Sequence, residues 1–380
     1  MMTEMMMDMA ELDVPKGLEG VKVDRSAISL VDGEAGRLTY RGYDIREVIE
    51  QPSEAVIWLL LAGEFPDQAT LSELSEFLLE QSELTDRDLS VLSAMPAQLH
   101  PMRMLQAFIP LMAAPSDVTF RNHHDLGLGL AMVARLLSVV AWWRCRERGV
   151  PWHHVEGEDR HTHFLTAFNG QEPAHQDTEI LNVVQILQME HSFNAGTFAA
   201  RVVTSTEASV QAALAAGCGA LSGPLHGGAD EQALLNARAV GFPDAVPAHI
   251  EEVLREKRKL MGMGHREYRT VDPRAVILKP MAIELCEGTD NETLCETLVA
   301  IDDQFSVEMA KRGKDIHANV EFYKGAVFLA LGIPAHYFTA MFACARAVGW
   351  LAHYMEAKAD NRLIRPQAVY CGPSLRSYRH

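Results

Sequence analysis

The sequence predicts a mainly α-helical protein with one small β-hairpin near the N-terminus. Apolar side chains recur at helical spacing along much of the 380-residue chain, for example in residues 71–78, 180–187 and 294–305. Only residues 26–41 contain a pair of short β-prone runs. Because no alternation of strands and helices follows this pair, the sequence does not favour a parallel α/β sheet.

Local sequence signals delimit the expected hairpin and two of the expected helices. The hairpin runs are residues 26–31 and 37–41, and the loop between them contains two glycines, which suits a chain reversal. Residues 55–62 are apolar and end at Gly63, with a proline shortly after it, which is typical of a helix stop. The periodic run at 180–187 follows Asp177 and Thr178, two suitable helix caps.

Composition limits the possible functions. The chain is 48% hydrophobic and 22% charged, and 51 acidic against 34 basic side chains give a formal charge of −17. Nucleic acids and anionic membranes bind through basic surfaces, so neither is an expected partner. The longest apolar stretch, near residues 130–145, contains Arg135 and Arg144, so we expect no membrane-spanning segment. A few arginines could still bind a small anion.

Cysteine usage and the N-terminus predict a cytoplasmic protein. Six cysteines without a CxxC pair are ordinary for a reducing compartment. The methionine-rich start has no basic residue before Lys16 and lacks the pattern of a secretory signal, so residues 1–16 are predicted to form a disordered tail. The length suggests two domains, or one large unit with an insertion.

Common catalytic and binding motifs are missing. The sequence has no GxxxxGK[ST] loop, no GxSxG elbow and no HExxH helix. The glycines around Met263 lack the preceding strand and third glycine of a dinucleotide site. Five histidines lie between His153 and His175, but their polar, unperiodic context indicates a surface loop, and no metal site is predicted.

Three glycine- or proline-flanked segments carry unusual polar residues. His226 lies within residues 221–230, His265 precedes an Asp-Pro-Arg run, and Glu321 lies in 319–323. Two glycine-positioned histidines and a carboxylate, with arginines nearby, favour acid–base chemistry on an anionic substrate.

These segments and several others resemble the citrate synthase family, including 2-methylcitrate synthase. The resemblance runs from about Gly17 to Pro373 and includes the following segments in the family's order: residues 28–45, His100-Pro-Met102, 194–201, Gly223-Pro-Leu-His-Gly-Gly228, Gly262-Met-Gly-His-Arg266 with Asp272-Pro-Arg274, Gly332-Ile-Pro334, 345–350, 361–366 and 370–373. It implies an almost all-helical homodimer. Residues 17–221 and 336–380 would form a large domain, and residues 222–335 a small one. Substrates would bind in a cleft that closes to exclude water.

The resemblance implies condensation of acetyl-CoA with oxaloacetate, giving citrate and CoA. Glu321 matches the base that removes the α-proton, His226 the donor to the thioester carbonyl, and His265 the group that polarises the ketone. Arginine forks suit the two carboxylates of oxaloacetate. The residues matched to oxaloacetate binding are Arg274, Arg346, His191 and Arg365, the last reaching in from the partner subunit.

For acyl-CoA, which is a substrate and not a cofactor, the turn at Met261, Gly262, Met263 and Gly264 could approach the adenine. Arg312 and Lys314 could meet its phosphates, or they could simply form a solvated helix end. The resemblance implies no metal and no redox cofactor.

The chain departs from the family pattern at the base. The family has Pro-Asn-Val-Asp where this chain has Ala318-Asn-Val-Glu321. Glutamate extends the carboxylate by roughly a bond length, and a misplacement of about 1 Å can cost around a hundredfold in rate. Two alternatives therefore stay open: a 2-methylcitrate synthase that uses propionyl-CoA, and a non-condensing relative that only binds such ligands.

Overall fold

The computed structural model describes residues 14–154, 159–265 and 267–378. The strands are β1 (Ser29–Asp32), β2 (Arg37–Tyr40) and β3 (Tyr43–Asp44). The helices are α2 (Ile45–Val48), α3 (Ser53–Ala62), α4 (Gln68–Glu80), α5 (Asp86–Ala94), α6 (Pro101–Phe108), α7 (His124–Arg148), α8 (Arg160–Asn169), α9 (His175–Met189), α10 (Ala195–Thr204), α11 (Val210–Leu221), α12 (Ala229–Val240), α13 (Val246–Arg255), α14 (Pro273–Cys286), α15 (Glu292–Ala310), α16 (Val320–Ala330) and α17 (Phe338–Ala359). Short 3-10 turns are η1 (Lys16–Leu18), η2 (Ile109–Leu111), η3 (Pro243–Ala245) and η4 (Ala335–Tyr337). The predicted tail falls mostly on residues 1–13, outside the described residues.

The predicted hairpin is confirmed. Strands β1 and β2 pair antiparallel with Ser29 opposite Tyr40, and β3 adds a third strand that the sequence analysis did not predict. The buried Tyr40 hydroxyl donates towards the carbonyl oxygens of Ile186 and Glu190, at 2.9 and 3.0 Å. The sheet is thereby attached to the C-terminal end of α9.

Most helices agree with the periodic pattern. Helix α3 ends at Gly63, whose φ of 94° is the left-handed conformation expected of a glycine stop. Helix α9, however, begins at His175, so the predicted cap at Asp177 is wrong. Asp177 lies in the first turn instead, where its carboxylate accepts the backbone N–H of Ala174.

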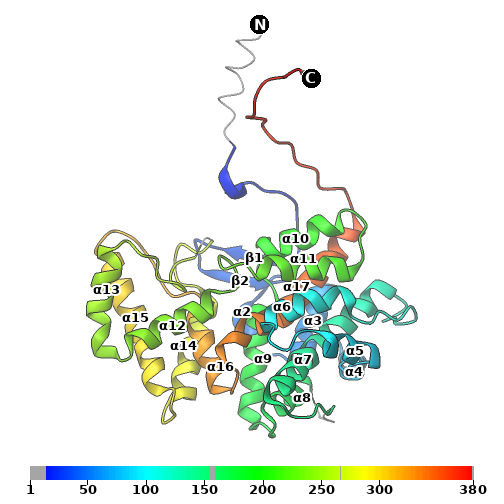
Figure 1. Ribbon diagram of the computed structural model, residues 1–380, viewed down its shortest axis with the longest axis horizontal. Helices are drawn as coiled ribbons and strands as arrows, with labels where there is room; N and C mark the ends of the chain where they lie inside the picture. Colours follow the sequence, from blue (N-terminus) through cyan, green and yellow to red (C-terminus); the bar gives the residue numbers. More distant parts are fainter. Residues whose placement is uncertain (1–13, 155–158, 266, 379–380) are drawn as a thin grey trace.

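The helices gather in two groups, shown in Figure 1. Helices α12 to α16 pack against one another on one side of the molecule. On the other side, α17 contacts α3, α7, α9, α10 and α11, and nearly all of its residues are buried. The domain boundaries at residues 222 and 335 stay a prediction.

Helix α7 is a core helix. Among the described helices, it is the one long and apolar enough to cross a membrane, yet 94% of the most apolar window is buried inside the protein. Its Arg135 is also buried, and the guanidinium donates to the carbonyl of Ala113 at 2.8 Å.

The prediction of a surface loop between His153 and His175 is wrong for its central part. Residues 160–169 form α8, in which His161 and His163 are buried. The polar composition of the stretch from His153 to His175 does not indicate the amphipathic helix α8 that forms within it. Residues 155–158 of this stretch lie outside the described residues.

Candidate active site

His265 lies in the loop between α13 and α14. Its Nδ1 accepts backbone N–H groups from Glu267 and Tyr268, at 3.0 and 3.3 Å. Burial lowers the pKa of His265, which keeps the ring neutral at pH 7. Because Nδ1 is the acceptor, the ring proton is on Nε2, which can donate to a carbonyl oxygen.

His226 lies just before the N-terminus of α12. Burial lowers its pKa to about 4, so this ring is neutral as well. Its Nε2 lies 3.4 Å from the backbone N of Gly196 and 3.2 Å from Oδ1 of Asn194. When Nε2 accepts the Gly196 N–H, the ring proton is on Nδ1, which then becomes a donor.

Glu321 lies in the first turn of α16, where the helix dipole favours a carboxylate. The side-chain oxygen of Asn319 caps the helix by accepting the Glu321 N–H at 3.2 Å. Burial is the largest effect on the pKa values of His226 and His265, and it lowers both. The negative charge of Glu321 raises both pKa values and so partly opposes burial. The carboxylate is therefore within electrostatic range of both rings.

The Met261–Gly264 turn is paired with the segment that leads to Glu321. Gly264 donates its N–H to the His317 carbonyl at 2.8 Å, and Asn319 donates to the Gly262 carbonyl at 2.9 Å. Gly262 has a φ of 82°, and a Cβ there would come within 2.8 Å of the Phe322 ring. Only glycine fits this close approach.

Two buried guanidinium groups border these residues. Arg274 forms a two-point ion pair with Asp272, at 3.0 and 2.7 Å. Arg346, on α17, donates from Nε to the Gln188 carbonyl at 2.6 Å. Burial lowers the pKa of Arg346 to about 10, so it stays charged at neutral pH.

His191 completes the group. Its Nε2 lies 3.1 Å from the Tyr268 hydroxyl, and its ring centroid lies 5.2 Å from that of His265. Burial, followed by the positive field of Arg274, lowers its pKa well below the usual value. The structure thus brings together six of the predicted residues: His191, His226, His265, Arg274, Glu321 and Arg346.

Other predicted residues lie outside this group. Arg312 and Lys314 are exposed just beyond the end of α15. Arg365 is exposed in the C-terminal segment, where it donates to the Pro366 carbonyl at 2.6 Å. Figure 1 shows this segment leading away from the helices.

Sequence reasoning missed the roles of Tyr268, Asp272 and Asn194 as partners of site residues. Asp272 and Asn194 lie in motifs that had been recognised, but no sequence pattern says which side chain each would bind. Tyr268 follows His265 by three residues, which was the available signal. Within the described part of the chain, no three His, Cys, Asp or Glu side chains are grouped to hold a metal ion.

The chain is similar to known proteins over most of its length. The family described as "Citrate synthase, C-terminal domain" matches residues 17–367. The chain belongs to the citrate synthase family. Its members are enzymes that condense an acyl-CoA with oxaloacetate, and the chain is therefore an acyltransferase of this type.

Two curated relatives show how the similarity is distributed. A citrate synthase of Acidithiobacillus ferridurans is 35% identical over 381 residues, covering 97% of this chain and 98% of the relative. A 2-methylcitrate synthase of Shewanella oneidensis is 32% identical over 367 residues, covering 95% of each.

The fold is also that of known citrate synthases. The enzyme from Thermoplasma acidophilum, solved as a ternary complex with carboxymethyl coenzyme A and oxaloacetate, superposes with a TM-score of 0.89. It is 29% identical, and the match covers 96% of this chain and 98% of the other. The fold class predicted from the sequence is confirmed.

Proposed function

We propose that this chain condenses acetyl-CoA with oxaloacetate and that Glu321 is the base. One observation carries the proposal: a carboxylate lies among two neutral histidines and two buried arginines. The Glu321 carboxylate takes a proton from the acetyl methyl group, and His226 donates to the oxygen that becomes the enolate. The enolate carbon attacks the ketone of oxaloacetate while His265 donates from Nε2 to the ketone oxygen. Water then cleaves the thioester, releasing citrate and CoA.

The cationic groups are suited to the dicarboxylate. Arg274 and Arg346 are buried and charged, and their guanidinium forks match carboxylate geometry. His191 adds a polar contact on the same side as His265. The neutral state of His226 and His265 matters, because a neutral imidazole polarises a carbonyl without first having to gain a proton.

Acyl-CoA, a substrate and not a cofactor, is proposed to bind along the Met261–Gly264 turn. Met263 and Gly264 are partly exposed there, and the backbone pairing with residues 317–319 holds the turn in place. Arg312 and Lys314, exposed beyond α15, are proposed to attract the phosphates.

We also propose a homodimer in which Arg365 completes the site of the partner subunit. The C-terminal segment is extended, and its Leu363, Tyr370 and Leu375 are exposed. Apolar side chains on an extended arm favour a second chain as their binding surface. A cytoplasmic location is part of the same proposal, since the six cysteines are free thiols.

The test is a steady-state assay of CoA release with oxaloacetate and either acetyl-CoA or propionyl-CoA. We expect a higher kcat/KM with acetyl-CoA, and a fall of at least about 10²-fold in Glu321→Gln, which keeps the side-chain volume but cannot accept the proton. A preference for propionyl-CoA would identify a 2-methylcitrate synthase, the alternative that the Shewanella relative supports. Binding of oxaloacetate without condensation of either thioester would contradict the proposal.

A further inference from the structure

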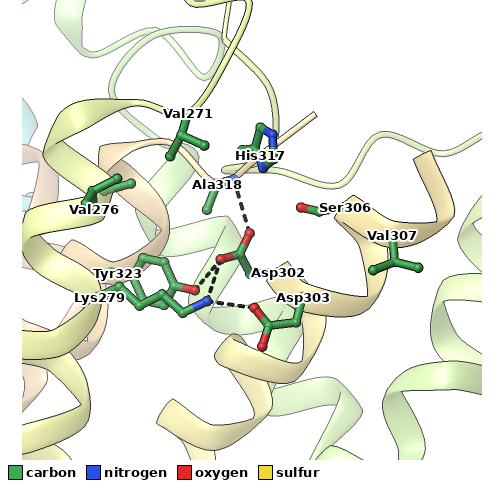
Figure 2. Close-up of a pocket in the computed structure, with 11 residues that line it drawn as sticks. Val271, Val276, Lys279, Asp302, Asp303, Ser306, Val307, His317, Ala318 and Tyr323 are labelled. Atoms are coloured by element: carbon green, nitrogen blue, oxygen red, sulfur yellow. Dashed lines mark hydrogen bonds and ion pairs between the residues drawn. The ribbon is translucent and has the colours of Figure 1, made fainter. Parts of the chain in front are cut away.

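The segment His317–Asn319, which leads into α16, borders a cavity of about 430 Å³ between α14, α15 and α16. Figure 2 shows the side chains that line it, which include the apolar Val271, Val276 and Val307 and the polar Lys279, Asp302 and Asp303. Ala318 is buried beside this cavity. Its backbone N–H therefore needs a hydrogen-bond acceptor within the protein, and such a bond supports the segment.

The support comes from Asp302 on α15. Its Oδ1 accepts the backbone N–H of Ala318 at 3.3 Å. Its Oδ2 accepts the Tyr323 hydroxyl at 2.5 Å and the Lys279 ammonium at 3.1 Å. Figure 2 shows Asp302 in contact with both Ala318 and Tyr323. Ala318 precedes Glu321 by three residues and Tyr323 follows it by two, so one carboxylate holds the chain on both sides of Glu321.

The contact between Asp302 and Ala318 also supports the loop that carries His265. The neighbours of Ala318 exchange backbone hydrogen bonds with Gly262 and Gly264, as described above. Fixing Ala318 therefore also fixes the turn that precedes His265. The substrate-binding arginines are held differently, Arg274 by Asp272 and Arg346 by the Gln188 carbonyl.

We infer that Asp302, together with Lys279 and Tyr323, is a positioning residue that sets where the Glu321 carboxylate lies relative to the reacting carbon. The inference rests on the proposed function, in which Glu321 is the base. Ala318 supplies the N–H that Asp302 accepts, and a proline at this position would have none. With alanine at position 318 this hydrogen bond can form, and this chain combines Ala318 with the longer glutamate base.

Because the network acts on the base and not on the arginines, disturbing it should change kcat rather than KM. In Asp302→Asn the amide has a single acceptor oxygen, which cannot serve Ala318 on one side and Tyr323 and Lys279 on the other. We expect kcat to fall about tenfold or more, with both KM values within about twofold, as for a misplaced catalytic group.

Asp303→Asn is the matched control. Asp303 is the adjacent residue and binds the same Lys279 ammonium at 2.7 Å, but its side chain is 60% exposed. Its kcat should stay within about twofold of wild type, in line with an exposed ion pair. Equal kcat values in the two variants would overturn the inference.

The background Glu321→Gln separates positioning from general structural damage. Without a base to misplace, the additional loss from Asp302→Asn should disappear, whereas a structural effect would persist and overturn the inference. Should Asp302→Asn not fold, Tyr323→Phe removes one donor and is expected to lower kcat several-fold; an unchanged kcat would count equally against the inference. Wild-type turnover in Glu321→Gln alone would instead overturn the proposed function.

Discussion

The carboxylate of Asp272 accepts the backbone N–H of Val320 at 3.1 Å, across 48 residues of sequence. The same carboxylate forms the two-point ion pair with Arg274. One buried anion therefore links an arginine proposed to bind oxaloacetate to the first turn of the helix that carries Glu321.

Asp272→Asn should destabilise the protein, and bound oxaloacetate should restore part of the lost stability. Removing one partner of a buried ion pair leaves an unpaired charge, which typically costs about 3–5 kcal/mol. A carboxylate of oxaloacetate can partly replace the missing anion, so oxaloacetate should raise the Tm of the variant by more than it raises that of the wild type. Thermal unfolding with and without oxaloacetate measures this. Asp315→Asn, which removes an exposed pair with His317, is the control, and equal Tm shifts in all three proteins would contradict the prediction.

Glu321→Asp should lower kcat by about a hundredfold, because the shorter side chain withdraws the carboxylate by roughly 1 Å or more. The KM for oxaloacetate should change little, since Arg274 and Arg346 are untouched. Steady-state kinetics of CoA release decide the matter. A higher kcat in this variant would mean that the site is spaced for aspartate.

Arg365→Ala should be folded but inactive, and activity should return on mixing with Glu321→Gln under subunit exchange. Each mixed dimer would contain one intact site, so random exchange should restore about a quarter of wild-type activity. Native mass spectrometry of the mixture verifies the exchange. Verified mixed dimers without activity would show that Arg365 does not act across an interface.

Acid should destabilise the protein between about pH 6.5 and pH 4. Burial lowers the pKa values of His161 and His163 to about 4. In the unfolded chain both titrate near 6.5, so the unfolded state binds more protons throughout this window and the free energy of unfolding falls as pH falls. The loss should approach roughly 3 kcal/mol for each histidine at pH 4.

Urea unfolding at several pH values tests this dependence. His163→Gln should flatten the curve, whereas His175→Gln should leave its slope unchanged, because the His175 side chain is 86% exposed. The same slope in all three proteins would exclude His163 as one of its causes.

The sequence predicts local structure well where the signal is itself local. Helices such as α4 and α15 follow from periodic apolar residues, and the hairpin follows from two β-prone runs around a loop with glycines. The buried state of His161 and His163 could not be predicted, because a polar composition does not reveal which face of a helix packs inward. The resemblance to the family identified six residues that meet in the site, although their roles stay predictions.

The supporting contacts depend on pairings between distant segments. Two hydrogen bonds, from Val320 to Asp272 and from Ala318 to Asp302, join different loops and helices. No spacing of residues in the sequence indicates either bond. The tautomer of His265 is similarly set by two backbone N–H groups that the loop happens to aim at Nδ1. Such features follow from tertiary geometry alone.

The hairpin loop has a consequence for the order in which the protein is made. Gly33 accepts the N–H of Arg269 at 2.9 Å, and a Cβ on Gly33 would lie 2.0 Å from the Glu267 carbonyl oxygen, so the loop after His265 rests directly against the hairpin. A ribosome adding about 5–20 residues per second reaches this loop roughly ten to fifty seconds after the hairpin. The residues of the hairpin therefore leave the ribosome well before the loop after His265, so the contact between them can form only late in synthesis.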